Sequence, residues 1–144
     1  MLTNKPNILV LCTGNSCRSQ MAEGFLRALA SDRFHVESAG SVPKAQIHPL
    51  AIQVMNEVGI DLSSQRPKDV KEFLGRLAVR HLIVVCSSAD KECPRIFPNI
   101  LDRTFWPVDD PDAYEGTEAE KLAEFRRVRD EILARIEAWL LIAK

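Results

Sequence analysis

The sequence predicts a single α/β domain over residues 1–144, with a central parallel sheet of about four strands and helices on both faces. Of the 144 residues 46% are apolar, which is enough for one substantial hydrophobic core. Short runs of branched apolar residues, typical of buried parallel strands, alternate with stretches of helical periodicity. No internal repeat, low-complexity tract or linker divides the sequence, which favours one domain.

Four segments have the composition of strands. Asn7–Leu11 contains the unbroken apolar run Ile-Leu-Val-Leu, and Val36–Ala39 is a shorter run that ends at a glycine. His81–Cys86 is the clearest central strand, because four consecutive residues in it are aliphatic. Thr104–Val108 is predicted as the last strand.

Four other segments are predicted as helices. In Gln20–Ala30 the apolar side chains recur on one face. Pro49–Val58 has proline in its first turn and is followed by glycine, which are usual signals for the start and end of a helix. Lys68–Leu77 is a weaker candidate, and Thr117–Ile142 carries a long apolar stripe opposite a charged face.

Composition argues against several classes of partner. A formal net charge of −1 gives no field that would attract nucleic acid or an anionic membrane. The apolar runs are too short to cross a bilayer, and the amino terminus lacks the apolar run of a secretion signal. A cytoplasmic protein is therefore expected, in which the four cysteines serve as catalytic, redox or metal-binding thiols.

The segment between the first strand and the first helix has the spacing of an oxyanion-binding loop. Cys12 and Arg18 frame five residues, and the following helix directs its N-terminal N–H groups and its dipole toward them. A tetrahedral oxyanion fits such a loop, and a guanidinium can donate two parallel hydrogen bonds to it. The predicted oxyanion-binding residues are Thr13, Gly14, Asn15, Ser16, Cys17, Arg18 and Ser19.

Cys12 is the predicted nucleophile of this loop. Thiols at helix N-termini or beside cations ionise more readily, so the field that binds an oxyanion also favours the Cys12 thiolate. Ser19 can donate a hydrogen bond to this thiolate, and Gly14 and Asn15 tolerate the left-handed backbone of a tight loop.

A second pair of cysteines follows the clearest strand. Cys86 ends that strand, and Cys93 lies seven residues later, before a proline. Because parallel strands end at the edge of the sheet where ligands bind, Cys86 and Cys12 are expected to lie near one another. The alternative is that Cys86 is an inert core thiol. The spacings of the four cysteines miss the usual zinc pattern, so no metal and no cofactor are predicted.

The stretch Cys12–Gly24, which reads CTGNSCRSQMAEG, resembles the signature of thioredoxin-coupled arsenate reductases, which have the fold of low-molecular-weight tyrosine phosphatases. The phosphatases usually continue this loop with Ser-Pro, so Gln20 and Met21 favour the reductases. The similarity extends along the chain through Ser38–Gly40, Val58–Asp61 and Asp109–Pro111.

The resemblance implies that arsenate is reduced to arsenite by a cascade of thiols. Cys12 attacks arsenate, Cys86 then attacks Cys12 and releases arsenite, and Cys93 attacks Cys86 in turn. The redox disulfide passes from Cys12–Cys86 to Cys86–Cys93, where thioredoxin, or glutaredoxin with glutathione, reduces it. Phosphate and sulfate are expected to bind as analogues of arsenate.

The resemblance also implies a proton donor. Asp110 stands directly before Pro111, which restricts it to an extended backbone, and it would protonate the leaving oxygen. Asp109 is expected to have no catalytic role. The histidines show no paired spacing and are predicted to be structural or surface residues; they are His35, His48 and His81.

The chain departs from the family at a potassium site. Several related reductases bind potassium near the loop, and two of the contributing positions match Asn15 and Ser38. Further ligands come from a segment where this chain has Arg66 and Lys68, whose charges would repel the ion. Either no ion binds, or the Lys68 ammonium takes its place and reaches the oxygens of Asn15 and Ser38.

Two other functions fit part of the pattern. A low-molecular-weight phosphatase would hydrolyse phosphotyrosine through a cysteinyl-phosphate on Cys12. The segment directly after the Asp-Pro pair, Asp112–Glu115, offers only the aromatic ring of Tyr114 to bind such a substrate. An oxyanion-binding or redox-sensing module without activity would not need Cys12, Arg18 and Asp110 together. The arsenate reductase hypothesis accounts for the second pair of cysteines as well.

Overall fold

A computed structural model describes residues 5–87, 100 and 102–143, and in this part of the chain four parallel strands form one sheet in the order β2-β1-β3-β4. The strands are β1 (Asn7–Cys12), β2 (His35–Gly40), β3 (Val79–Cys86) and β4 (Asp102–Pro107). The helices are α1 (Arg18–Ala30), α2 (Pro49–Glu57), α3 (Glu118–Ile142) and the 3-10 helices η1 (Val70–Glu72) and η2 (Pro111–Ala113). The predicted parallel sheet is confirmed.

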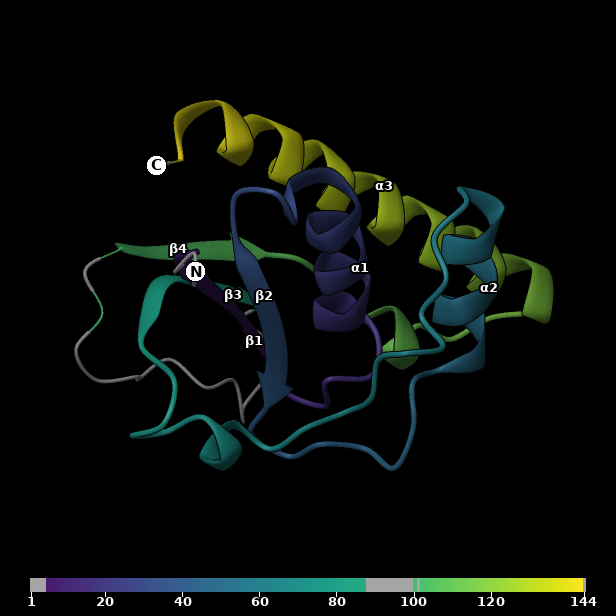
Figure 1. Cartoon of the computed structure of the whole chain (residues 1–144). Coiled ribbons are helices and arrows are strands. Elements are labelled where there is room, and N and C mark those ends of the chain that lie inside the picture. Colours follow the sequence, from purple (N-terminus) through teal and green to yellow (C-terminus); the bar gives the residue numbers. More distant parts are fainter. Residues whose placement is uncertain (1–4, 88–99, 101, 144) are drawn as a thin grey trace.

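The α-helices cover one face of the sheet (Figure 1). On that face Ile8 and Val10 of β1 join the buried side chains of all three α-helices in the main core. Leu9 and Leu11 point to the opposite face, where the described cover comes from the segment 70–77 around η1 and from Ile100. Helices were expected on both faces, and within the described residues the only helix on the second face is the 3-10 helix η1.

The segment Lys68–Leu77 was predicted as a helix, and it forms only η1. The backbone of its first residue forms hydrogen bonds outside the segment. The Lys68 N–H donates to Asn15 Oδ1, and the Lys68 carbonyl accepts from the Gly40 N–H. Gly75 then has a φ of 73°, which ends any helical path. The other predicted elements are present, with ends shifted by one or two residues.

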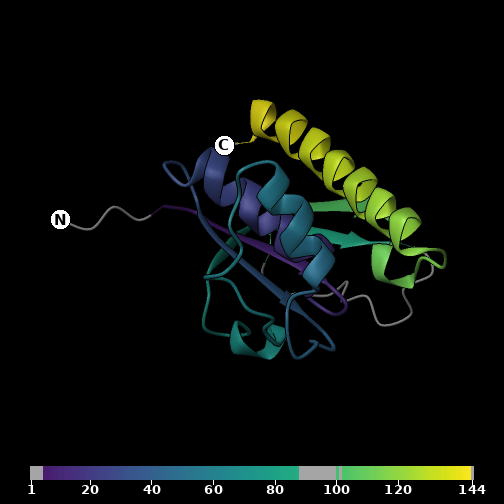
Figure 2. The same ribbon diagram turned by 90° about the vertical axis from the view of Figure 1, so that its right-hand side faces the viewer.

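Helix α3 begins with a complete capping box. Thr117 accepts a hydrogen bond from the Glu120 N–H, and the Glu120 side chain accepts one from the Thr117 N–H. Seen from the side, α3 lies along α1 and α2 and closes the main core (Figure 2). None of the helices in the described ranges is long and apolar enough to cross a membrane.

The carboxyl ends of the strands meet at one edge of the sheet. Strands β1 and β3 are neighbours, with Leu11 paired to Val84, so Cys12 and Cys86 both end at this edge. Both cysteines also belong to the same apolar cluster on the second face of the sheet. The expected proximity of the two strand ends is confirmed.

Candidate active site

The loop between β1 and α1 is shaped to receive an anion. Asn15 has a φ of 49°, the left-handed conformation that was expected in this tight loop. Helix α1 starts after Cys17, and no side chain caps it. The first N–H groups of α1 therefore remain available to a bound oxyanion, at the end of the helix that favours negative charge.

Cys12 lies at the base of this loop and is 2% exposed. Its Sγ is 2.8 Å from Ser19 Oγ, and it accepts a hydrogen bond from the Asn15 N–H at 3.2 Å. Ser19 Oγ in turn accepts from Asn15 Nδ2 at 2.7 Å, so the Ser19 hydroxyl proton is directed at the sulfur. Two donors on one sulfur suit a thiolate nucleophile.

Arg18 lies at the start of α1 and is 2% exposed. Its Nη1 donates to the Val108 carbonyl at 3.0 Å, and its Nη2 lies 3.7 Å from Asp110 Oδ2. The Val108 N–H donates to the Cys86 carbonyl at 3.1 Å. Val108, just after β4, therefore links the Arg18 guanidinium to the end of β3. The same guanidinium lies close to Asp110, the predicted acid.

The two aspartates before Pro111 have different surroundings. Asp110 faces Arg18, is about one third exposed, and accepts a hydrogen bond from the Asp112 N–H at 3.0 Å. The Asp109 side chain is 75% exposed, and its Oδ2 lies 3.9 Å from Nη2 of Arg127 on α3. Of the two, Asp110 is the carboxyl that lies beside the loop.

The cysteines are in different states. Cys86 is fully buried and disulfide-bonded, whereas Cys12 and Cys17 are free thiols. Burial raises the pKa of the Cys17 thiol far above its ordinary value, so this thiol stays protonated. Cys93 lies outside the described residues.

Glu23 of α1 also belongs to the site, although it was not predicted from the sequence. It is 1% exposed, and it accepts hydrogen bonds from Ser38 Oγ at 2.5 Å and from Arg27 Nε at 2.8 Å. Asn15 Nδ2 donates to the same Ser38 hydroxyl at 2.9 Å, which links Glu23 to the loop. A signal was present, because Glu23 follows Ser19 by one helical turn and therefore shares its face of α1.

Lys68 is the counterion of this buried carboxylate. Its Nζ lies 3.7 Å from Glu23 Oε1 and donates to the Arg66 carbonyl at 2.9 Å. The expectation that the ammonium contacts Asn15 and Ser38 directly is wrong, because its backbone N–H binds Asn15 instead. With a fixed ammonium beside Glu23, these residues do not fit a potassium ion, since the two cations would repel one another.

Thr13 and His48 complete the surroundings of the loop. The Thr13 hydroxyl is buried and has no hydrogen-bond partner among the described residues. His48, predicted to be a structural or surface residue, caps α2 and also lies 3.2 Å from Asp112. This second contact could not be predicted from a local pattern, because His48 and Asp112 are far apart in the chain.

The sequence of residues 7–144 matches the family of the low molecular weight phosphotyrosine protein phosphatases. The chain belongs to this family. An arsenate reductase of Halalkalibacterium halodurans is 43% identical over 136 residues, which are 94% of this chain and 96% of that protein.

Solved structures agree with this assignment. A structure described as an arsenate reductase in the phosphate binding state has a TM-score of 0.77 and 31% identity, with 94% of this chain and 97% of that chain covered. A thioredoxin-dependent arsenate reductase of Corynebacterium glutamicum has a TM-score of 0.64 and 27% identity, with 96% and 65% covered. The predicted resemblance is confirmed.

Proposed function

We propose that this chain is an arsenate reductase that uses Cys12 as its nucleophile. The observation that carries the proposal is the position of Cys86, which ends the strand next to Cys12 at the same edge of the sheet. A phosphatase needs no second thiol there, whereas a reductase must supply two electrons. The relatives in the same family that are named arsenate reductases support this choice.

The first step forms a covalent adduct. The Cys12 thiolate attacks the arsenic of arsenate, held by the loop N–H groups and the Arg18 guanidinium. An arsenic–oxygen bond breaks, and the leaving oxygen takes a proton from Asp110 and departs as water. Asp110 suits this role because it lies beside Arg18 at the mouth of the loop.

The second step transfers the electrons. The Cys86 thiolate attacks Cys12 Sγ, the sulfur–arsenic bond breaks, and its electron pair stays on arsenic, which leaves as arsenite. A Cys12–Cys86 disulfide remains. Cys93 then attacks Cys86, which releases the Cys12 thiolate and leaves a Cys86–Cys93 disulfide. A free Cys12 beside a disulfide-bonded Cys86 is the pattern expected after this exchange.

The external reductant is a dithiol or a thiol pair that reduces the Cys86–Cys93 disulfide. Thioredoxin is our first choice, because one structural relative is described as thioredoxin-dependent, and glutaredoxin with glutathione is the alternative. Both occur in reducing compartments, in keeping with the predicted cytoplasmic location. No partner nucleic acid or membrane is part of the proposal.

The decisive experiment compares two activities of the same variants. Arsenate turnover is followed by NADPH oxidation with thioredoxin and thioredoxin reductase, beside hydrolysis of p-nitrophenyl phosphate. Cys12→Ser should abolish both activities, because both need the nucleophile. Cys86→Ser and Cys93→Ser should abolish multiple-turnover reduction and spare hydrolysis. If Cys86→Ser reduced arsenate at the wild-type rate, the cascade would be wrong.

A second activity follows from the same loop. Arsenate and phosphate are both tetrahedral oxyanions, so weak hydrolysis of phosphate esters is expected, through a cysteinyl-phosphate on Cys12. Efficient hydrolysis without arsenate turnover would instead favour the phosphotyrosine phosphatase alternative.

A further inference from the structure

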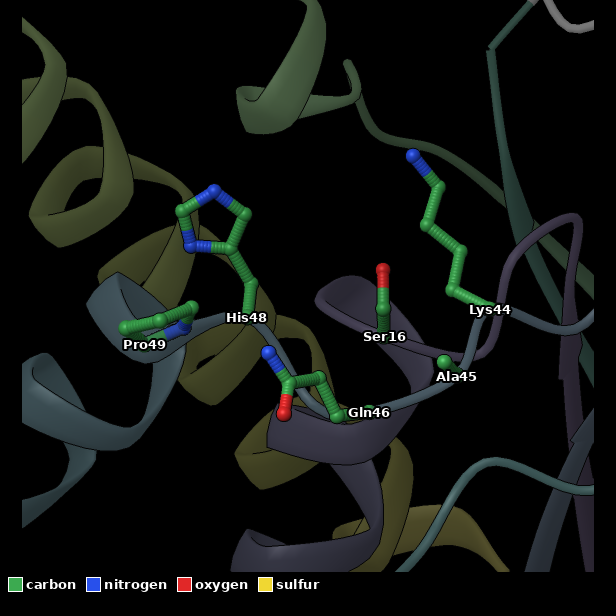
Figure 3. A pocket seen from close by; sticks show the side chains of 6 residues that line it. All are labelled: Ser16, Lys44, Ala45, Gln46, His48 and Pro49. Carbon is green, nitrogen blue, oxygen red and sulfur yellow. The ribbon is translucent and has the colours of Figure 1, made fainter.

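A hollow of about 250 Å³ opens beside the oxyanion loop. Figure 3 shows Lys44 and His48 on either side of it, with Ser16 of the loop between them. Neither Lys44 nor His48 has a step in the reaction proposed above. Both side chains nevertheless converge on one acidic residue.

That residue is Asp112, in η2. Lys44 Nζ donates to its Oδ2 at 2.9 Å, and His48 Nε2 lies 3.2 Å from its Oδ1, so both carboxylate oxygens are held. Burial alone would raise the pKa of Asp112, but the hydrogen bond and charge of Lys44, together with the hydrogen bond of His48, outweigh it and lower this pKa. Asp112 is therefore an ionised anchor.

His48 is itself fixed on two sides. Its Nδ1 accepts a hydrogen bond from the Leu50 N–H at 3.0 Å, so the ring proton is on Nε2, the atom that faces Asp112. Its ring packs against Phe125 of α3 with the centroids 4.7 Å apart. The imidazole has little freedom to turn away from Asp112.

The backbones of the two anchoring residues are bonded to the loop. The Lys44 N–H donates to the Gly14 carbonyl at 2.9 Å, and the His48 N–H donates to the Ser16 carbonyl at 3.0 Å. Asp112 in turn donates its N–H to Asp110 Oδ1 at 3.0 Å. A continuous path of bonds thus runs from the loop, through Asp112, to the predicted acid.

We propose that Lys44, His48 and Asp112 are positioning residues that hold the Asp110 carboxyl over the Cys12 loop. The inference rests on the proposed function, in which Asp110 donates the proton to the leaving oxygen. Asp112 gives and takes no proton in this step. Its role is to fix η2, because the direct contact of Asp110 with Arg18 is long, at 3.7 Å.

Positioning, rather than stability, is the effect to measure. Lys44 is 57% exposed, and an exposed ion pair adds little to folding free energy. Misplacing a catalytic group by about 1 Å, in contrast, can slow a reaction by about 100-fold. The variants should therefore lose much more rate than stability, and they should keep their affinity for inorganic phosphate.

The experiment is a single turnover of the fully reduced protein with arsenate, without external reductant, in which released arsenite is measured. This isolates the steps before the external reductant acts. Asp110→Asn should slow arsenite release by about 10²- to 10⁴-fold, the scale of general acid catalysis. Asp112→Asn should slow it by about 10- to 100-fold. The double variant should be no slower than Asp110→Asn alone, because Asp112 acts only through Asp110.

Two further variants keep the test independent of the folding of Asp112→Asn. His48→Asn retains a side chain that can cap α2 but is too short to hold Asp112 in the same way, and Lys44→Met removes the other partner. Both should slow arsenite release, and Lys44→Arg should restore most of the rate. Glu72→Gln, which removes a surface ion pair with Arg66, is the control and should leave the rate unchanged.

The outcomes separate the two proposals. Wild-type rates in Asp112→Asn, His48→Asn and Lys44→Met would overturn the positioning role, even if Asp110→Asn is slow. Multiplied effects in the double variant would also overturn it, because Asp112 would then act on its own. A wild-type rate in Asp110→Asn would refute the assignment of the acid in the proposed function.

Discussion

Asn15 stabilises the loop through both its backbone and its side chain. Its backbone adopts the left-handed conformation and donates its N–H to Cys12 Sγ. Its side-chain amide donates to Ser19 and Ser38 and accepts from the Lys68 N–H. All the donor and acceptor positions of this side chain but one lone pair are therefore used, and each bond supports the nucleophile directly or through its neighbours.

Replacing Asn15 should separate its backbone role from its side-chain role. Asn15→Ala and Asn15→Gly both remove the three side-chain bonds, so both should slow arsenate turnover by about 10-fold or more, in line with the loss of buried hydrogen bonds. Alanine is strained at positive φ and glycine is not. Urea unfolding should therefore find Asn15→Ala less stable than Asn15→Gly by about 1 kcal/mol.

Equal stability of the two variants would show that the backbone of the loop relaxes when the side chain is lost. A wild-type turnover rate in Asn15→Gly would show that the amide bonds are not needed for the reactivity of Cys12.

At the scale of elements, the end of β2 supports the loop that follows β1. Gly40 is the last residue of β2 and pairs with Cys12 across the two strands. A Cβ at this position would collide with the Thr13 carbonyl and crowd Asn15. Because the obstacle is backbone rather than a flexible side chain, the loop itself would have to move.

Gly40→Ala should therefore impair both folding and anion binding. Overpacking of this kind costs about 1–3 kcal/mol of unfolding free energy. The affinity for inorganic phosphate, measured by calorimetry on the reduced protein, should fall as well. Gly75→Ala is the matched control, because Gly75 has a φ of 73° and open space around its Cβ position. It should lose stability and keep its phosphate affinity, whereas unchanged affinity in Gly40→Ala would refute the steric role.

Across the whole molecule, apolar packing and buried charge have separate locations. The apolar core lies between the sheet and the three α-helices. Near the loop, buried polar side chains of α1, β2 and the segment before η1 form a network centred on Glu23 and Lys68. Such a buried pair holds separate elements in register, although its net contribution to stability is small while both partners are present.

Removing one partner of this pair should be costly. Lys68→Met leaves Glu23 buried with Ser38 and Arg27 as its remaining partners, and it should lower the unfolding free energy by roughly 3 kcal/mol. The wild type should melt at the same temperature in potassium and sodium buffers of equal ionic strength, because the Lys68 ammonium beside Glu23 would repel a potassium ion. Lys71→Met, an exposed lysine on η1, should behave as the wild type. A potassium-specific stabilisation of the wild type would contradict the assignment of Lys68 as the internal cation.

The strands, the position of the loop and its candidate nucleophile could all be predicted from the amino-acid sequence alone. Buried strands are visible as runs of aliphatic residues, and the spacing of Cys12 and Arg18 depends only on neighbours in the chain. The helix over Lys68–Leu77 was predicted wrongly, because tertiary hydrogen bonds to Asn15 and Gly40 outweigh a weak local preference.

The polar residues that support the loop, in contrast, could be identified only from contacts between segments that are distant in the chain. Glu23 and Lys68 are 45 positions apart in the chain, and Lys44 and Asp112 are 68 apart, so no local pattern connects them. Buried polar groups must find partners or pay a large desolvation cost, but which partner each one finds depends on how the helices pack on the sheet. The reactive groups Cys12 and Arg18 therefore follow from local sequence spacing, whereas the residues that support them follow from the packing of the helices on the sheet.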